Sequence, residues 1–266
     1  MPELAEVEYY RKEWDPGIGD PIVEVLAHPK ARIFRDAPAR AIVKHLKGEK
    51  LTGSFAHGKQ ILFQFSNGHW LGLHLGMTGR LSSQPRDYEP EKHDHLVLRG
   101  KKQTLVFCDP RMFGKVIFDR CEDFPEWWAA LPPAVTSDRF TRTKMEAFLG
   151  RFKKSPIKTV LMDQRFFPGI GNWMADEICW KIKIDPATRC GDLTAKQVNE
   201  LWKATREVSR KALQIIGEDW SDPPKTWLFT HRWKDGGKCP RKGCGADLVR
   251  ADLRGRTTCW CPQCQG

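Results

Sequence analysis

The stretch FFPGIGNWMADE, residues 166–177, decides how the second half of the chain is arranged. Its glycines at 169 and 171 allow a tight turn and a close approach of the backbone to a ligand. Asn172 then begins a helix, and the first N–H groups of a helix attract anions. A turn between two helices that presents N–H groups to a phosphate is a common way to bind DNA, although the same residues could form an ordinary turn.

Helical periodicity surrounds this turn over residues 142–150, 156–163, 172–183 and 195–216. Pro132 and Pro133 mark a boundary, and the sequence before them has a different character. Short runs of alternating polarity there predict antiparallel strands at residues 61–65, 70–75, 95–99, 104–107 and 115–118. We therefore expect an α+β protein, with an antiparallel β-sandwich and one N-terminal helix (3–14) in residues 1–135, and a helical domain in residues 136–232.

The last part, residues 233–266, is short, basic and rich in cysteine. Four intervening residues separate Cys239 from Cys244, and two separate Cys261 from Cys264. Two such pairs around a hairpin-length insert are typical of a structural zinc site. Cys259 is a spare thiol on the expected hairpin, or a competitor of Cys261 as a ligand.

Composition limits the possible partners and compartment. The chain has 44 Lys and Arg against 33 Asp and Glu, a formal net charge of +11, which indicates a polyanionic partner. No apolar run is long enough to span a bilayer, and the first residues do not form a signal peptide. We expect a cytoplasmic protein, associated with the nucleoid if the source is bacterial.

The N-terminus, MPELAEVE, raises a separate possibility. Methionine before a small residue is commonly removed, which would leave Pro2 with a free secondary amine, a nucleophile. The alternative is an ordinary helix start, in which proline occupies the first turn and Glu3 and Glu6 favour the positive end of the helix dipole.

Six motifs, in order, resemble the formamidopyrimidine-DNA glycosylase / endonuclease VIII family of bifunctional DNA repair enzymes. They are PELAEVE, GKQILFQF, LHLGMTG, DPRMFG, LMDQRFFPGIGNWMADEI and the tail ending CPQCQ, and they cover nearly the whole chain. The resemblance implies that Pro2 attacks C1′ of the damaged nucleoside. It also implies that Glu3 is the acid/base carboxylate, that Glu6 organises the N-terminus and its water, and that Lys59 holds the phosphate next to the lesion.

The resemblance assigns DNA contacts as well. Met77, Arg111 and Phe113 would fill the gap left by the extruded nucleotide. Asn172 and Gly171, in a helix-two-turn-helix domain, and Arg256, in a β-hairpin zinc finger holding one structural Zn²⁺, would grip phosphates.

The implied activity is excision of formamidopyrimidine, 8-oxoguanine and hydantoins from duplex DNA through an N-terminal Schiff base. Strand cleavage by β,δ-elimination would follow at the abasic site. The implied partner is double-stranded DNA containing oxidised bases or abasic sites, bound by a monomer and without a membrane.

The sequence departs from the family pattern at three places. Ala5 replaces the usual proline, and the first cysteine pair has four intervening residues instead of two. Residues 217–239 lack the Gly-rich stretch that closes over 8-oxoguanine in typical members, so we predict that 8-oxoguanine is processed less well than formamidopyrimidines, hydantoins or abasic sites.

Two other functions compete with this one. A catalytically idle protein of the same fold could recognise lesions or bent DNA, but it would have no reason to retain Pro2, Glu3 and Lys59 together. A zinc-ribbon protein unrelated to repair would explain the tail and the charge, but not the N-terminus.

Overall fold

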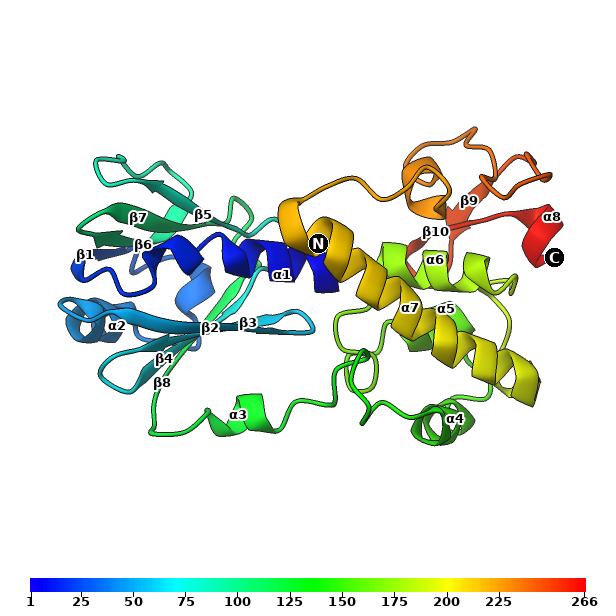
Figure 1. Ribbon diagram of the computed structural model, residues 1–266, viewed down its shortest axis with the longest axis horizontal. Coiled ribbons are helices and arrows are strands. Elements are labelled where there is room, and N and C mark those ends of the chain that lie inside the picture. Colours follow the sequence, from blue (N-terminus) through cyan, green and yellow to red (C-terminus); the bar gives the residue numbers. More distant parts are fainter. The chain divides into compact units, whose positions relative to one another are not determined.

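The computed structural model describes residues 1–266, and the chain divides into two units, each with its own hydrophobic core (Figure 1). The first unit comprises Met1–Pro2 and Glu6–Leu131, and the second comprises Glu3–Ala5 and Pro132–Gly266. No helix in the structure is both long and apolar enough to cross a membrane.

The first unit is built on two antiparallel sheets of four strands each. One has the order β1-β6-β7-β5 and the other β2-β3-β4-β8. The strands are β1 (Ile22–Ala27), β2 (Leu51–His57), β3 (Gln60–Phe65), β4 (His69–His74), β5 (Arg80–Pro85), β6 (Asp94–Gly100), β7 (Gln103–Cys108) and β8 (Lys115–Arg120).

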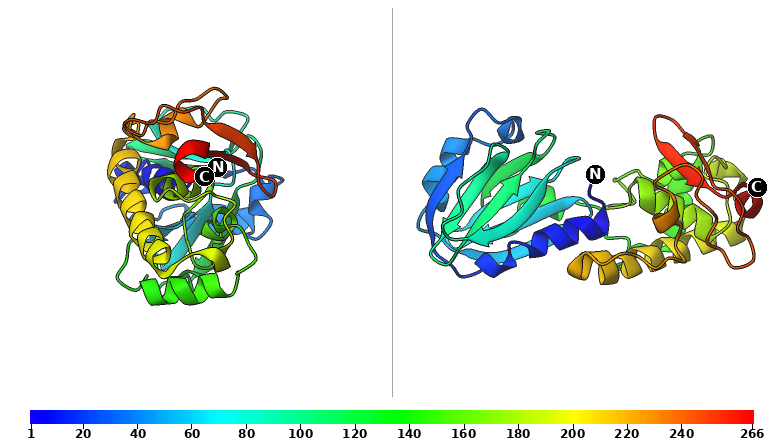
Figure 2. Two further views of the ribbon diagram at one scale, coloured as in Figure 1. Left: turned by 90° about the vertical axis from the view of Figure 1, so that its right-hand side faces the viewer. Right: turned by 90° about the horizontal axis from the view of Figure 1, so that it is seen from above.

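The core of the first unit lies between its two sheets, which face each other in Figure 2. Phe63 and Leu71 from one sheet and Leu96 and Phe107 from the other belong to the same buried cluster. Along a strand every second residue belongs to this cluster, for example Ile61, Phe63 and Phe65 in β3, because successive side chains point to opposite faces of a sheet. The predicted β-sandwich is therefore confirmed.

Three helices accompany the sheets: α1 (Leu4–Lys12), α2 (Ala39–Leu46) and α3 (Glu126–Ala129). The first is shorter at both ends than the predicted helix over residues 3–14. Glu3 precedes it, because the Glu3 carboxylate is bonded to another helix, as described below. Trp14 lies beyond it, fully buried, and its indole N–H donates to the carbonyl of Val106.

The second unit contains the predicted helices, with small differences at their ends. They are α4 (Arg142–Gly150), α5 (Ile157–Leu161), α6 (Asn172–Lys181) and α7 (Ala195–Asp219). Thr194 and Gln197 form a capping box at the start of α7. This helix continues through Gly217, where the sequence predicted an end at residue 216, and stops at Trp220 in the left-handed conformation.

A small cysteine-rich subdomain completes the second unit. It consists of the antiparallel hairpin β9 (Val249–Asp252) and β10 (Thr257–Trp260), followed by α8 (Pro262–Gln265). The hairpin therefore turns over residues 253–256, within the insert between the two cysteine pairs.

Candidate active site and DNA-binding residues

The N-terminus and Lys59 lie together in the first unit. Gly58 and Lys59 form the two-residue turn between β2 and β3, and Gly58 has a positive φ of 60°, which suits glycine. The Lys59 ammonium is 3.9 Å from the sulfur of Met1. The turn thus holds a cation beside the beginning of the chain, where Pro2 is half-buried.

Glu3 is buried and receives hydrogen bonds from the start of α6. Its Oε2 accepts from the backbone N–H groups of Gly171, at 2.9 Å, and Met174, at 3.1 Å. Its Oε1 accepts from the N–H of Trp173 at 3.0 Å. A carboxylate at the positive end of a helix dipole is also favoured electrostatically. These bonds fix the residue next to Pro2 in the chain.

The role of Gly171 differs from the sequence-based expectation. A Cβ at this position would lie 2.2 Å from the carboxyl carbon of Glu3, so any other residue would push the Glu3 carboxylate out of this place. The sequence predicted that this turn brings its N–H groups to a DNA phosphate, but the anion bound by the Gly171 N–H is the protein's own Glu3. Glu6 lies on α1, in the first unit, and is half-buried.

The three predicted gap-filling residues lie on two adjacent loops of the first unit. Met77 follows β4, and Arg111 and Phe113 lie between β7 and β8. Met77 and Phe113 are 40% and 41% exposed, so both apolar side chains are accessible to a partner. The Arg111 guanidinium lies 4.7 Å from the centre of the Phe113 ring. We call residues 75–79 and 109–114 the wedge loops.

His74, at the end of β4, was not among the predicted site residues. Its Nδ1 accepts from the backbone N–H of Gly76 at 3.0 Å, which ties it to the first wedge loop. Burial, with a further contribution from the charge of Lys59, lowers its pKa to about 4. The ring is therefore neutral near pH 7, with Nε2 as a hydrogen-bond donor. A polar residue within the apolar run WLGLHL is the sequence signal that could have identified it.

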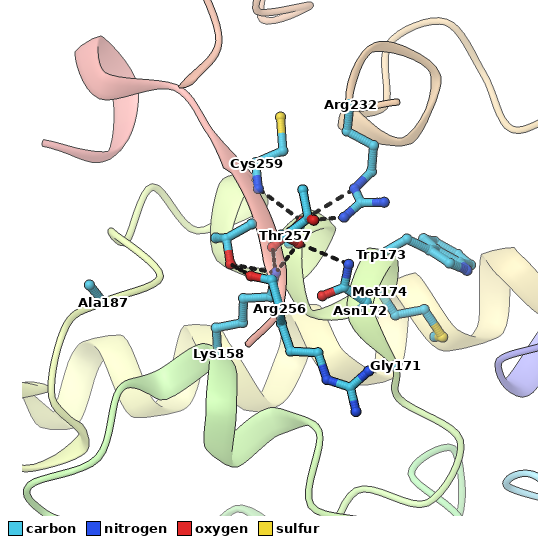
Figure 3. Close-up of polar contacts among 12 residues, drawn as sticks. Lys158, Gly171, Asn172, Trp173, Met174, Ala187, Arg232, Arg256, Thr257 and Cys259 are labelled. Atoms are coloured by element: carbon cyan, nitrogen blue, oxygen red, sulfur yellow. Dashed lines mark hydrogen bonds and ion pairs between the residues drawn. The ribbon is translucent and has the colours of Figure 1, made fainter. Parts of the chain in front are cut away.

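In the second unit, Asn172 and Arg256 are brought together by Thr257 (Figure 3). One amide N–H of Asn172 donates to the Thr257 carbonyl at 2.9 Å. The amide group has a second N–H, which this contact orients but does not use. Arg256 directly precedes Thr257 and is exposed.

A buried ionic cluster, missed at the sequence level, supports this pair of residues. The Lys158 ammonium lies 2.6 Å from Asp176 Oδ1, and it donates to the Thr258 hydroxyl at 2.8 Å and the Thr257 carbonyl at 3.1 Å. The ammonium thus has one ionic partner and two hydrogen-bond acceptors. Burial lowers the pKa of this lysine, and Asp176 opposes the shift.

The other oxygen of Asp176 completes the cluster. It accepts from Arg232 Nη2 at 2.6 Å and from the backbone N–H of Cys259 at 3.1 Å. The three charged side chains are almost fully buried and together carry one excess positive charge. The cluster connects α5 and α6 to strand β10 and therefore fixes the hairpin next to Asn172 (Figure 3).

The four predicted ligand cysteines form one cluster. The sulfurs of Cys239, Cys244, Cys261 and Cys264 all lie within 4.8 Å of one another. Four thiolates about 2.3 Å from a tetrahedral Zn²⁺ would be separated by about 3.8 Å, so this donor set fits the metal. Cys259 is outside the cluster, and burial raises the pKa of its thiol to about 11.

The segment before the cysteine cluster is attached to α6. The backbone N–H of Phe229 donates to Glu177 Oε2 at 2.9 Å, and the Phe229 ring packs edge-on against Trp173 with centroids 4.8 Å apart. Burial raises the pKa of Glu177 to about 7.

The sequence and the fold both match known proteins. The formamidopyrimidine-DNA glycosylase N-terminal domain matches residues 1–116, and the H2TH domain of the same glycosylase matches residues 131–222. The chain is 33% identical to the formamidopyrimidine-DNA glycosylase of a Roseiflexus species, with both chains covered completely. It is equally identical to that of Thermus thermophilus, of which 99% is covered.

Solved structures agree. Lactococcus lactis Fpg bound to DNA containing an oxidised pyrimidine has a TM-score of 0.89 and 27% identity, with 99% of each chain covered. The same protein bound to DNA with an abasic site has a TM-score of 0.88 at the same identity and coverage. The matches extend over the sandwich, the helical region and the cysteine-rich end, and they show that the chain belongs to the formamidopyrimidine-DNA glycosylase family.

Proposed function

We propose that this DNA glycosylase of base excision repair removes oxidised bases with Pro2 as its nucleophile and then cleaves the strand by β,δ-elimination. The observation that carries the proposal is the anchoring of Glu3 by the N–H groups at the start of α6. It fixes the residue adjacent to Pro2, while the Lys59 turn lies beside the chain start. An ordinary helix start would need neither feature.

The chemistry follows from the residue type. After removal of Met1, the amine of Pro2 has a pKa near that of a free α-amine, about 8, so a useful fraction is neutral near pH 7. Its lone pair forms a bond to C1′ while the C1′–base bond breaks and the base takes the electron pair. Ring opening gives an iminium, which acidifies the C2′ proton, and loss of that proton expels the 3′ phosphate. A second elimination then expels the 5′ phosphate.

Glu3 would serve as the acid and base of these steps. Its carboxylate, held next to Pro2 by the N–H groups at the start of α6, would carry a proton to and from the sugar ring oxygen. Glu6 would help to organise the N-terminus. Lys59, and with it the neutral Nε2–H of His74, would hold the phosphate next to the lesion.

DNA would be held by both units. In the first, Met77 and Phe113 would enter the gap left by the extruded nucleotide, and Arg111 would face the orphaned base. In the second, the free N–H of Asn172 and the guanidinium of Arg256 would bind phosphates, with Gly171 contributing by leaving room for Glu3. The partner would be double-stranded DNA with an oxidised base or an abasic site, bound by a monomer in the cytoplasm. The net charge of +11 supports binding to the polyanionic DNA.

We further propose one structural Zn²⁺ bound by Cys239, Cys244, Cys261 and Cys264. The metal would supply folding free energy to a small subdomain with little apolar content. The division of labour would then be catalysis in residues 1–135, DNA binding by the helix-two-turn-helix region in 136–232, and a zinc finger in 233–266.

The substrate preference follows from the segment after α7. Phe229 in this segment is hydrogen-bonded to Glu177 and packed on Trp173. This attachment leaves the segment little free length with which to close over a large purine lesion. We expect slower excision of 8-oxoguanine than of formamidopyrimidines, hydantoins or abasic sites. Single-turnover rates measured side by side test this, and equal or faster excision of 8-oxoguanine opposite cytosine would contradict it.

Borohydride trapping tests the central proposal. Protein with Met1 removed is mixed with duplex DNA carrying an abasic site or a formamidopyrimidine, reduced, and mapped by mass spectrometry. We expect an adduct on Pro2 that is absent in Pro2→Gly. Pro38→Gly, at the start of α2, is the matched control and should be trapped normally. If DNA binds but nothing is trapped, the chain is instead an idle DNA-binding protein of the same fold.

A further inference from the structure

One buried carboxylate of the first unit, Asp109, has no place in the chemistry above. It follows the last residue of β7 and is fully buried. Its Oδ1 accepts from the hydroxyl of Thr78 at 2.8 Å, and its Oδ2 accepts from the backbone N–H of Gly114 at 2.7 Å. The two oxygens therefore bind two different loops.

Both partners stand next to residues that are proposed to enter the DNA. Thr78 directly follows Met77, and Gly114 directly follows Phe113. Asp109 is itself fixed by its main chain. Its N–H donates to the carbonyl of His93 at 3.0 Å, and the His95 ring lies 3.1 Å from the Asp109 carbonyl. The carboxylate is thus a rigid bridge between the wedge loops.

The backbones of the two loops are also in direct contact. Gly76 has a positive φ of 62°, and a Cβ there would lie 2.4 Å from the carbonyl carbon of Phe113. A Cβ on Gly114 would lie 2.9 Å from Asp109 Oδ2. The absence of a Cβ at Gly76 thus lets the two loops pack backbone against backbone, and the hydrogen bonds of Asp109 oppose their separation.

We propose that Asp109, acting through Thr78, is a positioning residue that makes the two wedge loops move as one body when the damaged nucleotide leaves the helix. This inference rests on the proposed role of Met77, Arg111 and Phe113. Unstacking a base pair step costs free energy, so a wedge must resist being pushed back. Two separate loops could each be displaced by the base pairs that they separate. A bridged pair resists this displacement because it is attached to the β-sandwich through Asp109.

Thr78→Val tests the bridge because it removes the hydroxyl and keeps the shape. Thr78→Ser retains the hydroxyl and should behave as the parent protein. Ser83→Ala is the matched control. It removes a hydroxyl of β5 that donates to Gln103 of the neighbouring strand β7, away from the wedge loops. Thermal unfolding shows whether Thr78→Val disturbs folding. If it does, Thr78→Ala, which has a smaller side chain, replaces it.

Two rates are measured in single-turnover experiments with each variant. The first is excision of an oxidised base from a fully paired duplex, with 2-aminopurine beside the lesion reporting unstacking by fluorescence. The second is cleavage at a preformed abasic site, where no base has to leave the stack. We expect Thr78→Val to slow unstacking and excision about tenfold or more, from loss of a hydrogen bond to a charged group, and to leave abasic cleavage within about twofold.

The bridge is refuted if Thr78→Val matches Ser83→Ala, or if both rates fall equally, because a general loss of structure would do the latter. Met77→Ala separates this inference from the proposed function. Slow excision in Met77→Ala with normal excision in Thr78→Val would overturn the bridge alone. Normal excision in both would overturn the gap-filling role itself.

Discussion

Asp109 in the first unit and Asp176 in the second are both fully buried carboxylates that hold functional loops, but they are satisfied differently. Asp109 accepts from a hydroxyl and a backbone N–H, which are neutral. Asp176 is paired with Lys158 and Arg232, which are charged. Removing a neutral donor leaves a modestly weakened carboxylate, whereas removing the Lys158 ammonium takes an ionic partner from Asp176 and leaves two further buried acceptors without their donor. The second unit should therefore be the more fragile one.

Lys158→Met gives the largest expected effect. It would leave the Thr257 carbonyl and the Thr258 hydroxyl without their donor and should lower the free energy of unfolding by about 3–5 kcal/mol. Because Thr257 orients Asn172, DNA binding should weaken as well. Chemical denaturation and DNA titration measure both effects. Lys181→Met, which removes a partly exposed ion pair with Glu207, is the control and should cost less than about 1 kcal/mol.

Glu177 gives the next effect, and the size of this effect depends on pH. Burial raises its pKa to about 7, so the folded state keeps a proton that the unfolded state loses above about 4.5. This group therefore lowers stability progressively as the pH rises from about 4.5 to 7. Glu177→Gln stays neutral and can still accept from Phe229.

We expect Glu177→Gln to stabilise the protein by up to about 3 kcal/mol at pH 8 and to have no effect at pH 4. Thermal unfolding at the two pH values measures it. A variant that is equally stable, or less stable, at pH 8 would show that the charged carboxylate is satisfied in the folded state.

Asp109→Asn should cost less than Lys158→Met, about 1–3 kcal/mol, because the amide can place only one acceptor between two donors. Denaturation by urea, with both variants in the same buffer, measures the difference. If Asp109→Asn proves the more costly, the neutral-donor site is the stronger anchor and the comparison is reversed.

The smallest effect concerns the surface of the second unit. Arg256→Ala should leave stability unchanged and reduce the slope of log binding constant against log salt by about 1, the value for one lost phosphate contact. Arg254→Ala, at the same hairpin turn, is the matched variant. An unchanged slope in Arg256→Ala would remove this residue from the proposed phosphate contacts.

The sequence predicted the elements with regular patterns and missed those without them. The alternating run ILFQF and the helix over residues 142–150 were identified closely, because periodicity reports a buried face. β1, β2 and β5 were missed. In β1, IVEVLA is apolar at five of six positions and so does not alternate, while LTGSFAH and RLSSQP are too polar or too rich in small residues to alternate clearly. α2 was missed because it is a single amphipathic stretch of eight residues between loops.

Site residues were predictable only where chemistry is concentrated in a motif. The cysteine spacing located the four-cysteine cluster, and the Gly-rich turn located the start of α6. Neither could show that the anion at this turn is Glu3, because the two segments are about 170 residues apart and no local pattern links them. Lys158 was missed for the same reason, since a lysine in an apolar helix reads as exposed until its distant partner is known.

The bond between Glu3 and Gly171 has a consequence for biosynthesis. Its two residues are separated by 168 positions, so the bond cannot form until the chain has grown well past its midpoint. At about 5–20 residues per second, ribosomal synthesis leaves roughly 8–34 s during which the first residues are untethered. An aminopeptidase can remove Met1 within that interval. Chains that escape it would become anchored with the Pro2 nitrogen still acylated, and would be folded but without the proposed nucleophile.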